Sequence, residues 1–255
     1  ALPFPLTGAQ QRVIGEISVD LAGPHPMHRL LQGDVGAGKT MVALMALLRG
    51  VEAGMQAAML APTEILARQH YASLQKILSG LPINIAILTG REKGSLREAT
   101  LMGLADGSIH ILVGTHAVFQ KDVEFDDLRL AVIDEQHRFG VAQRLALRSK
   151  MQADGMEPHM LMMTATPIPR TLAMSYYADL DVSVIDELPP GRTPIVTRVL
   201  SAARRDELVT RIREQVLAGR QVYWVCPLIE ESEALDLRHA TQAHTSETRG
   251  ARLEL

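Results

Sequence analysis

Short apolar runs alternate along the chain with longer stretches that have helical spacing. The first such run, at 57–62, reads AAMLAP, and a later one, at 128–135, reads LRLAVIDE. Continuous apolar runs of this length are typical of strands buried on both faces of a parallel sheet. We therefore predict strands at 57–62, 83–90, 109–115, 128–135 and 159–166.

The segment after the first predicted strand has the pattern of an amphipathic helix. Its apolar residues recur at helical spacing, as expected for a helix that covers one face of a sheet. They are Ile65, Leu66, Leu74, Ile77 and Leu78. A strand–helix–strand order implies right-handed crossovers, and hence an α/β fold with a parallel sheet and helices on both faces. Ligands of such folds bind at the carboxyl ends of the strands.

A proline-rich stretch at 186–194 interrupts this pattern. Its sequence, DELPPGRTP, is typical of an extended linker. We predict a first domain over 1–188, followed over 189–255 by a linker and the incomplete start of a second domain. The second would contain strands at 195–200 and 221–229 with a helix between them. The apolar side of that helix would consist of Leu208, Val209, Ile212 and Val216.

The composition is that of a globular protein, with 47% hydrophobic and 22% charged residues. The 26 Lys and Arg residues nearly balance the 29 Asp and Glu residues, so the formal charge of −3 makes no general electrostatic case for nucleic acid. A lone cysteine, Cys226, excludes an internal disulfide. No run approaches the ~18 apolar residues of a membrane span, and the first residues do not resemble a secretory signal. We expect a cytoplasmic protein with no membrane partner.

A glycine-rich segment lies between the apolar pair Leu30-Leu31 and a helical pattern. Its sequence, GDVGAGKT, satisfies the phosphate-binding pattern G-x-x-x-x-G-K-[ST]. Glycines let successive backbone N–H groups turn toward a phosphate, and the helix amino terminus adds partial positive charge. In this pattern Lys39 reaches the β and γ phosphates, and the Thr40 hydroxyl binds Mg²⁺. A glycine-rich turn before an ordinary helix is the alternative. The expected ATP site comprises Gly33, Asp34, Val35, Gly36, Ala37, Gly38, Lys39 and Thr40.

Four polar residues follow the apolar residues LAVI of the predicted strand at 128–135. Asp134 is the candidate to hold Mg²⁺ beside Thr40, directly or through water, because Mg²⁺ prefers oxygen ligands. Glu135 would orient and deprotonate the water that attacks the γ phosphate. Gln136 and His137 would sense whether the γ phosphate is present. A polar turn in which Asp134 caps a helix is the alternative.

These motifs resemble those of a known superfamily. GDVGAGKT, DEQH and the Thr164-Ala165-Thr166 triplet look like motifs I, II and III of the superfamily 2 helicases. More narrowly, LTGAQQRV, APTEILARQH, VGTHAVFQ, VIDEQHRFGVAQRLAL and VYWVCPLIEESE resemble the RecG family of ATP-dependent DNA helicases, as does 163–194. The resemblance implies a RecA-like P-loop domain over the predicted first domain. It also implies a motor that uses ATP to remodel branched DNA, such as forks and Holliday junctions, in recombination and repair.

The same resemblance implies roles outside the phosphate loop. Gln10 matches the glutamine that reads the adenine edge. Thr63 in APTE, and Thr115 and His116 in GTHA, match segments along the path of the DNA backbone. A hydroxyl or main-chain N–H at a strand end is suited to phosphate contact without reading bases. Thr89-Gly90-Arg91 is similar in position. The alternative is an ordinary polar turn at each of the segments after the strands, and an ordinary surface glutamine at Gln10.

Thr164 and Thr166 flank the end of the last predicted strand. A hydroxyl pair there is suited to hydrogen-bond the DEQH segment, which would link the state of the phosphate to the grip on DNA. Arg170, after TPIP, matches a residue that either contacts DNA or holds the next helix. These residues are the candidate coupling elements.

The resemblance places several parts of such a motor outside this sequence. They are an arginine of the second RecA-like domain that stabilises the transition state, the later helicase motifs and a wedge domain that splits branches. An arginine of this kind contributes ~10³ to 10⁵ in rate in related enzymes. We therefore expect this chain to bind ATP with Mg²⁺ and hydrolyse it slowly, without unwinding DNA by itself.

Other functions remain compatible with the motifs. Within the same superfamily, the chain also resembles the motor of transcription-repair coupling factors, and an RNA or duplex translocase would share its motifs. A small-molecule phosphotransferase would use the same phosphate loop but would need an acceptor pocket and a lid. A binding module that has lost turnover is a third alternative, against which the intact Lys39, Asp134 and Glu135 argue.

Overall fold

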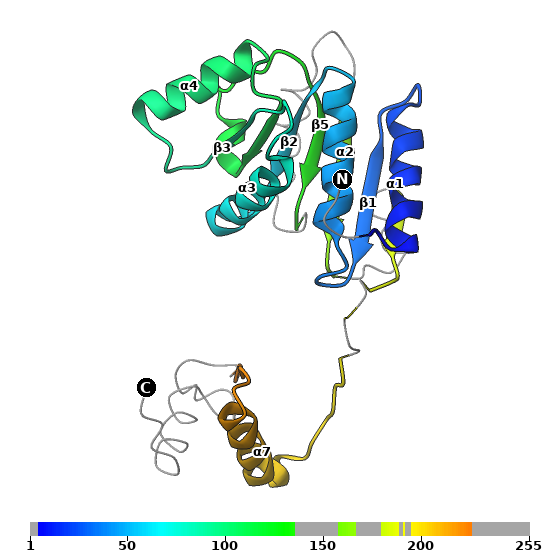
Figure 1. Cartoon of the computed structure of the whole chain (residues 1–255), viewed down its shortest axis with the longest axis vertical. Coiled ribbons are helices and arrows are strands. Elements are labelled where there is room, and N and C mark those ends of the chain that lie inside the picture. Colours follow the sequence, from blue (N-terminus) through cyan, green and yellow to red (C-terminus); the bar gives the residue numbers. More distant parts are fainter. Residues whose placement is uncertain (1–4, 136–157, 167–179, 189–190, 192–194, 226–255) are drawn as a thin grey trace, which may run out of the picture. The chain divides into compact units, whose positions relative to one another are not determined.

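The computed structural model describes residues 5–135, 158–166, 180–188, 191 and 195–225 (Figure 1). The chain divides into two compact units, Ala1–Thr193 and Pro194–Leu255. The division falls at the end of the proline-rich stretch, whereas the sequence analysis placed the boundary after residue 188.

The first unit contains a seven-stranded sheet in the order β3-β4-β2-β5-β6-β1-β7, and its neighbouring strands are paired in parallel. Each predicted strand of this unit is present, so the parallel α/β fold is confirmed. The strands are β1 (His28–Gly33), β2 (Gln56–Leu60), β3 (Ile85–Leu88), β4 (Ile111–Gly114), β5 (Leu128–Ile133), β6 (His159–Thr164) and β7 (Asp181–Ile185).

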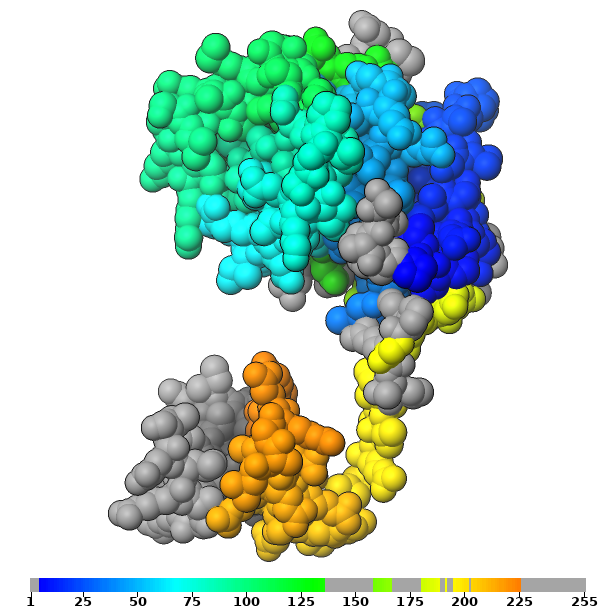
Figure 2. All heavy atoms as spheres, in the orientation of Figure 1, coloured from blue at the N-terminus to red at the C-terminus, as the bar shows by residue number. Residues whose placement is uncertain are grey.

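Helices cover both faces of this sheet. One hydrophobic cluster joins α1, α2 and α3 to one face of the strands, and a second joins α4 and the 3₁₀ helix η1 to the other. In the space-filling view, α1 in dark blue, α2 in light blue and α3 in cyan all reach the same surface of the first unit (Figure 2). The bounds are α1 (Gly8–Leu21), α2 (Lys39–Glu52), α3 (Glu64–Leu78), α4 (Gly94–Ala105) and η1 (His116–Phe119).

The strands are buried on both faces because successive side chains point to opposite sides. In β1, Leu31 packs with the cluster of α1, α2 and α3, whereas Leu30 packs with the opposite cluster. In β2, Met59 and Leu60 divide in the same way. Both faces therefore require apolar residues, which explains why these strands appear in the sequence as continuous apolar runs.

Helix α3 packs through most of the predicted residues, with Ala67 and His70 in addition. Ala67, His70, Leu74 and Leu78 form its buried stripe, whose spacing of three and four residues matches the helical repeat. Leu66 and Ile77 are partly buried against the same core. The prediction for Ile65 is wrong, because this side chain lies in the first turn, away from the sheet, and is 80% exposed.

Strand β7 was missed in the sequence analysis. Among the described strands it pairs with β1 only, at one edge of the sheet. Its buried residues are Ser183 and Ile185, and the residues around them are exposed or partly buried. The buried Ser183 accepts a hydrogen bond from Arg29 Nη1 at 2.8 Å. A short edge strand with polar residues lacks the apolar run that marks the central strands.

The described part of the second unit consists of a 3₁₀ turn, η3 (Ala202–Arg204), and a helix, α7 (Arg205–Leu217). The predicted helix is confirmed, although none of its residues is buried. The predicted strand at 195–200 is wrong, because these residues are not in a strand. Residues 221–225 are not in a strand either, and the rest of that prediction lies outside the described residues. An extended segment becomes a strand only when a neighbour completes its hydrogen-bond ladder.

Among the described helices, none combines the length and the hydropathy required to cross a bilayer.

Candidate functional site

The predicted phosphate loop and the predicted acids lie at the same edge of the sheet. The loop follows β1, whereas Asp134 and Glu135 follow β5, and the sheet order places β6 between these two strands. At a strand spacing of about 4.8 Å, the two segments are separated by about 10 Å across the end of β6. The two segments therefore do not follow adjacent strands, and the gap between them is wide enough for a phosphate group and its cation.

The phosphate loop turns sharply at two glycines. Gly36 and Gly38 have φ of 79° and 87°, which is the left-handed region that side chains with a Cβ disfavour. Asp34, Val35 and Gly36 are exposed, while Ala37 is 1% exposed and its N–H donates to Asp34 O at 3.0 Å. The loop is therefore anchored at Ala37 and open at its tip, as an anion-binding turn before a helix requires.

Lys39 lies between the loop and the acids. Its Nζ donates to Gly33 O at 2.6 Å and to Asp34 O at 3.0 Å. Burial lowers the pKa of the Lys39 ammonium, while the charges of Asp134, Glu135 and Asp34 act in the opposite direction. The charges of the two acids after β5 therefore act on the lysine of the phosphate loop. The structure thus places Lys39, with its predicted phosphate role, near Asp134 and Glu135, whose metal and base roles stay predictions.

Asp134 is fixed at the start of the turn after β5. Its N–H donates to Leu60 O at 2.8 Å, and its Oδ1 accepts from Glu135 N at 3.0 Å. Its Oδ2 lies 2.7 Å from His70 Nε2. Glu135 has φ of 49°, an uncommon conformation for a residue with a Cβ, of the kind that recurs at functional sites. The chain therefore turns sharply directly after Asp134.

His70 was missed as a site residue. It belongs to α3, is 9% exposed, and reaches Asp134 from the stripe formed by Ala67, Leu74 and Leu78. A histidine in the apolar stripe of a helix requires a hydrogen-bond partner when it is buried. That position was the available signal, but the sequence does not identify the partner.

Gln10 connects α1 to the phosphate loop. Its Nε2 donates to Ala37 O at 2.9 Å, and its Oε1 accepts from Thr7 N at 3.0 Å. Thr7 Oγ1 in turn accepts from Gln10 N at 3.2 Å, which completes a capping box at the start of α1. The glutamine is 4% exposed. It lies beside the loop, and recognition of adenine stays a prediction.

The residues around the loop fit a magnesium nucleotide. Thr40 lies in the first turn of α2, and Asp134 provides the carboxylate across the gap. Mg²⁺ needs few protein ligands, since it takes water and substrate phosphates as its other oxygen ligands. The described residues contain no group of three or more His, Cys, Asp or Glu arranged for a metal. A pocket beside the loop is lined by Gln32, Gly33, Asp34, Ala165 and 184–188.

The residues predicted to contact DNA lie at the other half of the same sheet edge, after the adjacent strands β3, β4 and β2. Thr63 is exposed and caps α3 by accepting from Leu66 N at 3.4 Å. Thr115 is 3% exposed, whereas the neighbouring His116 is exposed. Of that pair, His116 is the side chain that a ligand at the surface would touch. Their roles in DNA binding stay predictions.

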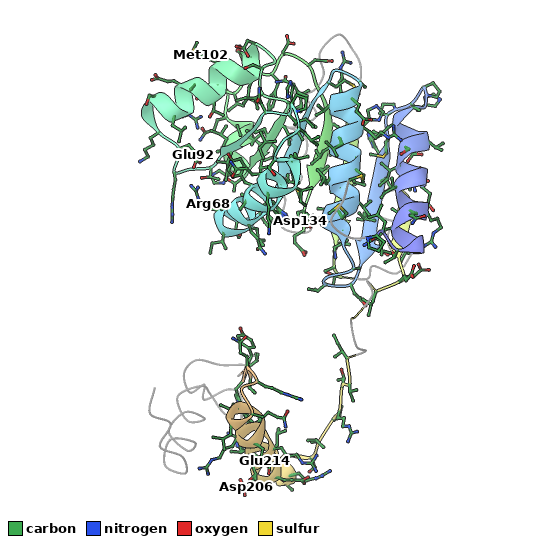
Figure 3. The ribbon with its side chains drawn as sticks, viewed as in Figure 1. Arg68, Glu92, Met102, Asp134, Asp206 and Glu214 are labelled. Atoms are coloured by element: carbon green, nitrogen blue, oxygen red, sulfur yellow. The ribbon has the colours of Figure 1, made fainter. Side chains whose placement is uncertain are left out.

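A buried carboxylate organises the turn after β3. Glu92 Oε2 accepts from both the N–H and the hydroxyl of Thr89 at 2.6 Å. Its Oε1 accepts from Arg68 Nη2 at 2.7 Å, and Figure 3 labels both of these side chains. Burial alone would raise the pKa of Glu92, but the hydrogen bonds from Thr89 and Arg68 outweigh it and lower that pKa. Arg91 remains 75% exposed and pairs with Glu64 at 2.9 Å. Thr89 therefore holds the turn, while Gly90 and Arg91 are exposed.

The coupling residues are described in part. Thr166 N donates to Thr164 Oγ1 at 3.1 Å, and the two hydroxyl oxygens lie 3.4 Å apart. Thr164 and Thr166 therefore form a local turn at the end of β6, between the phosphate loop and Asp134. Gln136, His137 and Arg170 lie outside the described residues.

Comparison with known proteins finds relatives that carry the same description. The ATP-dependent DNA helicase RecG of Escherichia coli O127:H6 is 55% identical over 241 residues, which cover 94% of this chain and 35% of the relative. The protein of the same name from Aquifex aeolicus is 50% identical over 243 residues, covering 95% of this chain and 30% of the relative. This chain therefore spans about a third of the length of the curated relatives that it matches.

Solved structures show the same fold. RecG bound to a three-way DNA junction superposes with a TM-score of 0.74 at 44% identity, over 86% of this chain and 29% of that one. The DEAD-box helicase Mss116, bound to single-stranded RNA, superposes with a TM-score of 0.59 at 20% identity, over 85% of this chain and 49% of that one. The family model of the DEAD/DEAH box helicases matches residues 7–175. With this match, the parallel sheet and the paired phosphate-loop and acidic segments, the chain belongs to the DEAD/DEAH box helicase family.

Proposed function

We propose that this chain is the ATP-binding motor part of a helicase that remodels branched DNA. Three observations support the proposal. The relatives that match nearly the whole chain are ATP-dependent DNA helicases, and a similar protein is known bound to a three-way DNA junction. The site has the residues for binding and hydrolysing a nucleoside triphosphate, and the same sheet edge carries exposed residues suited to a DNA backbone.

Each residue has a defined role in this proposal. The loop amides and Lys39 bind the β and γ phosphates, Gln10 reads the adenine edge, and Thr40 and Asp134 hold the cation. Magnesium, when bound, neutralises negative charge on the β and γ phosphates. Glu135 orients the attacking water and accepts its proton.

The DNA side of the edge is proposed to bind phosphates rather than bases. Thr63, Arg91 and His116 are exposed after β2, β3 and β4, where hydroxyl, guanidinium and imidazole groups suit contact with a backbone. Thr164 and Thr166, with Gln136 and His137, are proposed to connect this half of the edge to the phosphate site. Arg170 is proposed either to contact DNA or to hold the following helix.

One observation carries the nucleotide part of the proposal. The charges of Asp134 and Glu135 act on the Lys39 ammonium, although nearly a hundred residues separate them from it in the sequence. A binding turn without turnover would not require a carboxylate pair facing its lysine. The arrangement has the parts that water-dependent hydrolysis of a phosphate needs.

Substitution of the proposed base tests this function. Glu135→Gln should reduce ATP hydrolysis by about 100-fold or more, because the amide cannot accept the proton, while binding of a fluorescent ATP analogue with Mg²⁺ stays within about threefold. Lys39→Ala serves as the comparison and should weaken that binding itself. Hydrolysis is measured as free phosphate. Equal turnover by the Glu135→Gln and parent chains would contradict the assignment, and label transferred from the γ phosphate to a metabolite would indicate a phosphotransferase.

The nucleic-acid substrate is tested in the whole gene product. ATP turnover is measured with a three-way DNA junction, a linear duplex and single-stranded RNA at equal phosphate concentration and equal salt, because backbone binding depends on both. We expect the strongest stimulation from the junction. Equal stimulation by plain duplex would favour a duplex translocase such as a transcription-repair motor, and stimulation by RNA would favour an RNA helicase.

A further inference from the structure

A buried histidine outside the predicted motifs contacts the proposed metal ligand. His70 Nε2 lies 2.7 Å from Asp134 Oδ2, and the two side chains are 11% and 13% exposed. We propose that His70 is a positioning residue that fixes the Asp134 carboxylate for the magnesium nucleotide and connects it to helix α3. This inference rests on the proposed function, because it adds a supporting residue to the same site.

The two hydrogen bonds to Asp134 fix its orientation. Oδ1 accepts from Glu135 N at 3.0 Å, and Oδ2 lies 2.7 Å from His70 Nε2. A carboxylate in its ionised form only accepts hydrogen bonds, so with ionised Asp134 the donor of this bond is the Nε2–H tautomer of His70. Each carboxylate oxygen can accept more than one hydrogen bond, so both retain capacity for a cation or its bound water. Outer partners of this kind hold a ligand in the geometry that the metal needs.

His70 is itself held rigidly. Ala67 and Leu74, its neighbours along the buried stripe of α3, are fully buried, and α3 packs against β3 and β4. The imidazole can therefore move little without moving the helix. A histidine–aspartate pair at the surface would lack this support, because an exposed side chain samples other rotamers at little cost in free energy.

Helix α3 also links this contact to the DNA side of the edge. The helix is capped by Thr63, a predicted backbone contact, and His70 lies about two turns further along the same element. Asp134 N donates to Leu60 O at the end of β2, so the strand that leads into α3 is bonded to the same aspartate. A displacement of α3 on binding DNA would thus be transmitted to the metal ligand through His70.

Substitutions that separate volume from hydrogen bonding test the proposal. His70→Phe keeps a ring but removes the donor, whereas His70→Gln retains an N–H that reaches Asp134. We expect His70→Phe to raise the Mg²⁺ concentration for half-maximal binding of a fluorescent ATP analogue about tenfold. Binding of the analogue without Mg²⁺ should stay within about twofold of the parent chain. His70→Gln should restore most of the Mg²⁺ response.

Two further measurements distinguish positioning from packing. Gln69→Ala, at an exposed neighbouring position of α3, should behave as the parent chain. Direct Mn²⁺ binding in the presence of nucleotide, measured by electron paramagnetic resonance, should weaken in His70→Phe to the same extent as the Mg²⁺ response. If His70→Phe does not fold, the comparison is between His70→Gln and His70→Asn, whose shorter amide does not reach Asp134.

The outcomes have separate meanings. A folded His70→Phe chain with an unchanged Mg²⁺ midpoint would overturn this inference, as would equal Mg²⁺ responses of the Gln and Asn variants. Loss of nucleotide binding in every His70 variant with and without Mg²⁺ would also overturn it, since a positioning role affects only the cation-dependent part. A parent chain that does not bind ATP at all would instead contradict the proposed function.

Discussion

Gly38 shows how a single residue shapes the phosphate site. It has φ of 87°, and a Cβ at this position would overlap the Nε2 of Gln10. The loop therefore needs glycine there both for its backbone conformation and for the close approach of the glutamine amide. The pattern G-x-x-x-x-G-K-[ST] identified this glycine from the sequence, but its contact with Gln10 depends on how α1 packs beside the loop.

Gly38→Ala should therefore weaken binding of ATP with Mg²⁺ by at least about tenfold, measured by fluorescence titration. The added methyl displaces Gln10, and the left-handed backbone costs about 1 kcal/mol or more. Gly54→Ala is the control, because Gly54 has φ of 79° but no atom within 4 Å of the added Cβ. We expect that control to lose some stability and no nucleotide affinity. Equal loss of affinity in both variants would show that the loop itself does not bind the nucleotide.

At the scale of elements, buried polar residues join segments that the apolar pattern describes only separately. Glu92 links the turn after β3 to Arg68 of α3, and His70 links α3 to the end of β5. These contacts fix how α3 sits at the edge where nucleotide and DNA are expected to bind. The sequence did not show which of these polar residues would pair. The partners are far apart in the chain, and the apolar spacing of each helix or strand is the same with or without these contacts.

Glu92→Gln should lower the free energy of unfolding at pH 7 by about 1–3 kcal/mol, because charged hydrogen bonds to Thr89 and Arg68 are weakened. Because the pKa of Glu92 is lowered in the folded state, its stabilising contribution is fully present at pH above the unfolded-state pKa of 4.5. That contribution is lost as the pH falls through the folded-state pKa. The variant should therefore lose less stability than the parent chain between pH 7 and pH 3.5 in urea unfolding. Glu98→Gln, at an exposed position of α4, is the control. Parallel pH profiles for Glu92→Gln and the parent chain would refute this account.

At the scale of the whole molecule, the described core belongs to the first unit. The buried residues of the described chain lie at or before Ile185, and α7 buries none of its residues. The first unit therefore contains its own hydrophobic core, which is the physical requirement for folding independently. The predicted strand at 195–200 fails for the corresponding reason, since the described residues offer it no neighbouring strand.

A chain that ends at Thr193 should therefore keep the cooperative unfolding transition and the nucleotide affinity of the 255-residue chain. We expect the unfolding temperature, measured by calorimetry, to change by less than about 2 °C, which for a domain of this size corresponds to less than about 1 kcal/mol. Matched titrations with the fluorescent ATP analogue check the site. A broad transition or a lost affinity would show that residues after 193 contribute to the first unit.

The sequence by itself determined the positions of strands β2 to β6, the parallel α/β class and the residues of the phosphate loop. These features are local: a strand buried on both faces must be apolar throughout, and an anion-binding turn must have glycines at particular spacings. The same reasoning could not find β7, because an edge strand needs few apolar residues, or exclude Ile65, because helical spacing alone does not locate the edge of a buried stripe.

Only the tertiary structure decided which segments meet. Sheet order places β6 between the phosphate loop and Asp134, brings β3, β4 and β2 together at the other half of the edge, and sets His70 against Asp134. Such pairings depend on which strands are neighbours and on how each helix crosses the sheet. Many strand orders are compatible with the same local periodicity, so periodicity cannot specify these contacts. Packing of the complete core selects a single strand order.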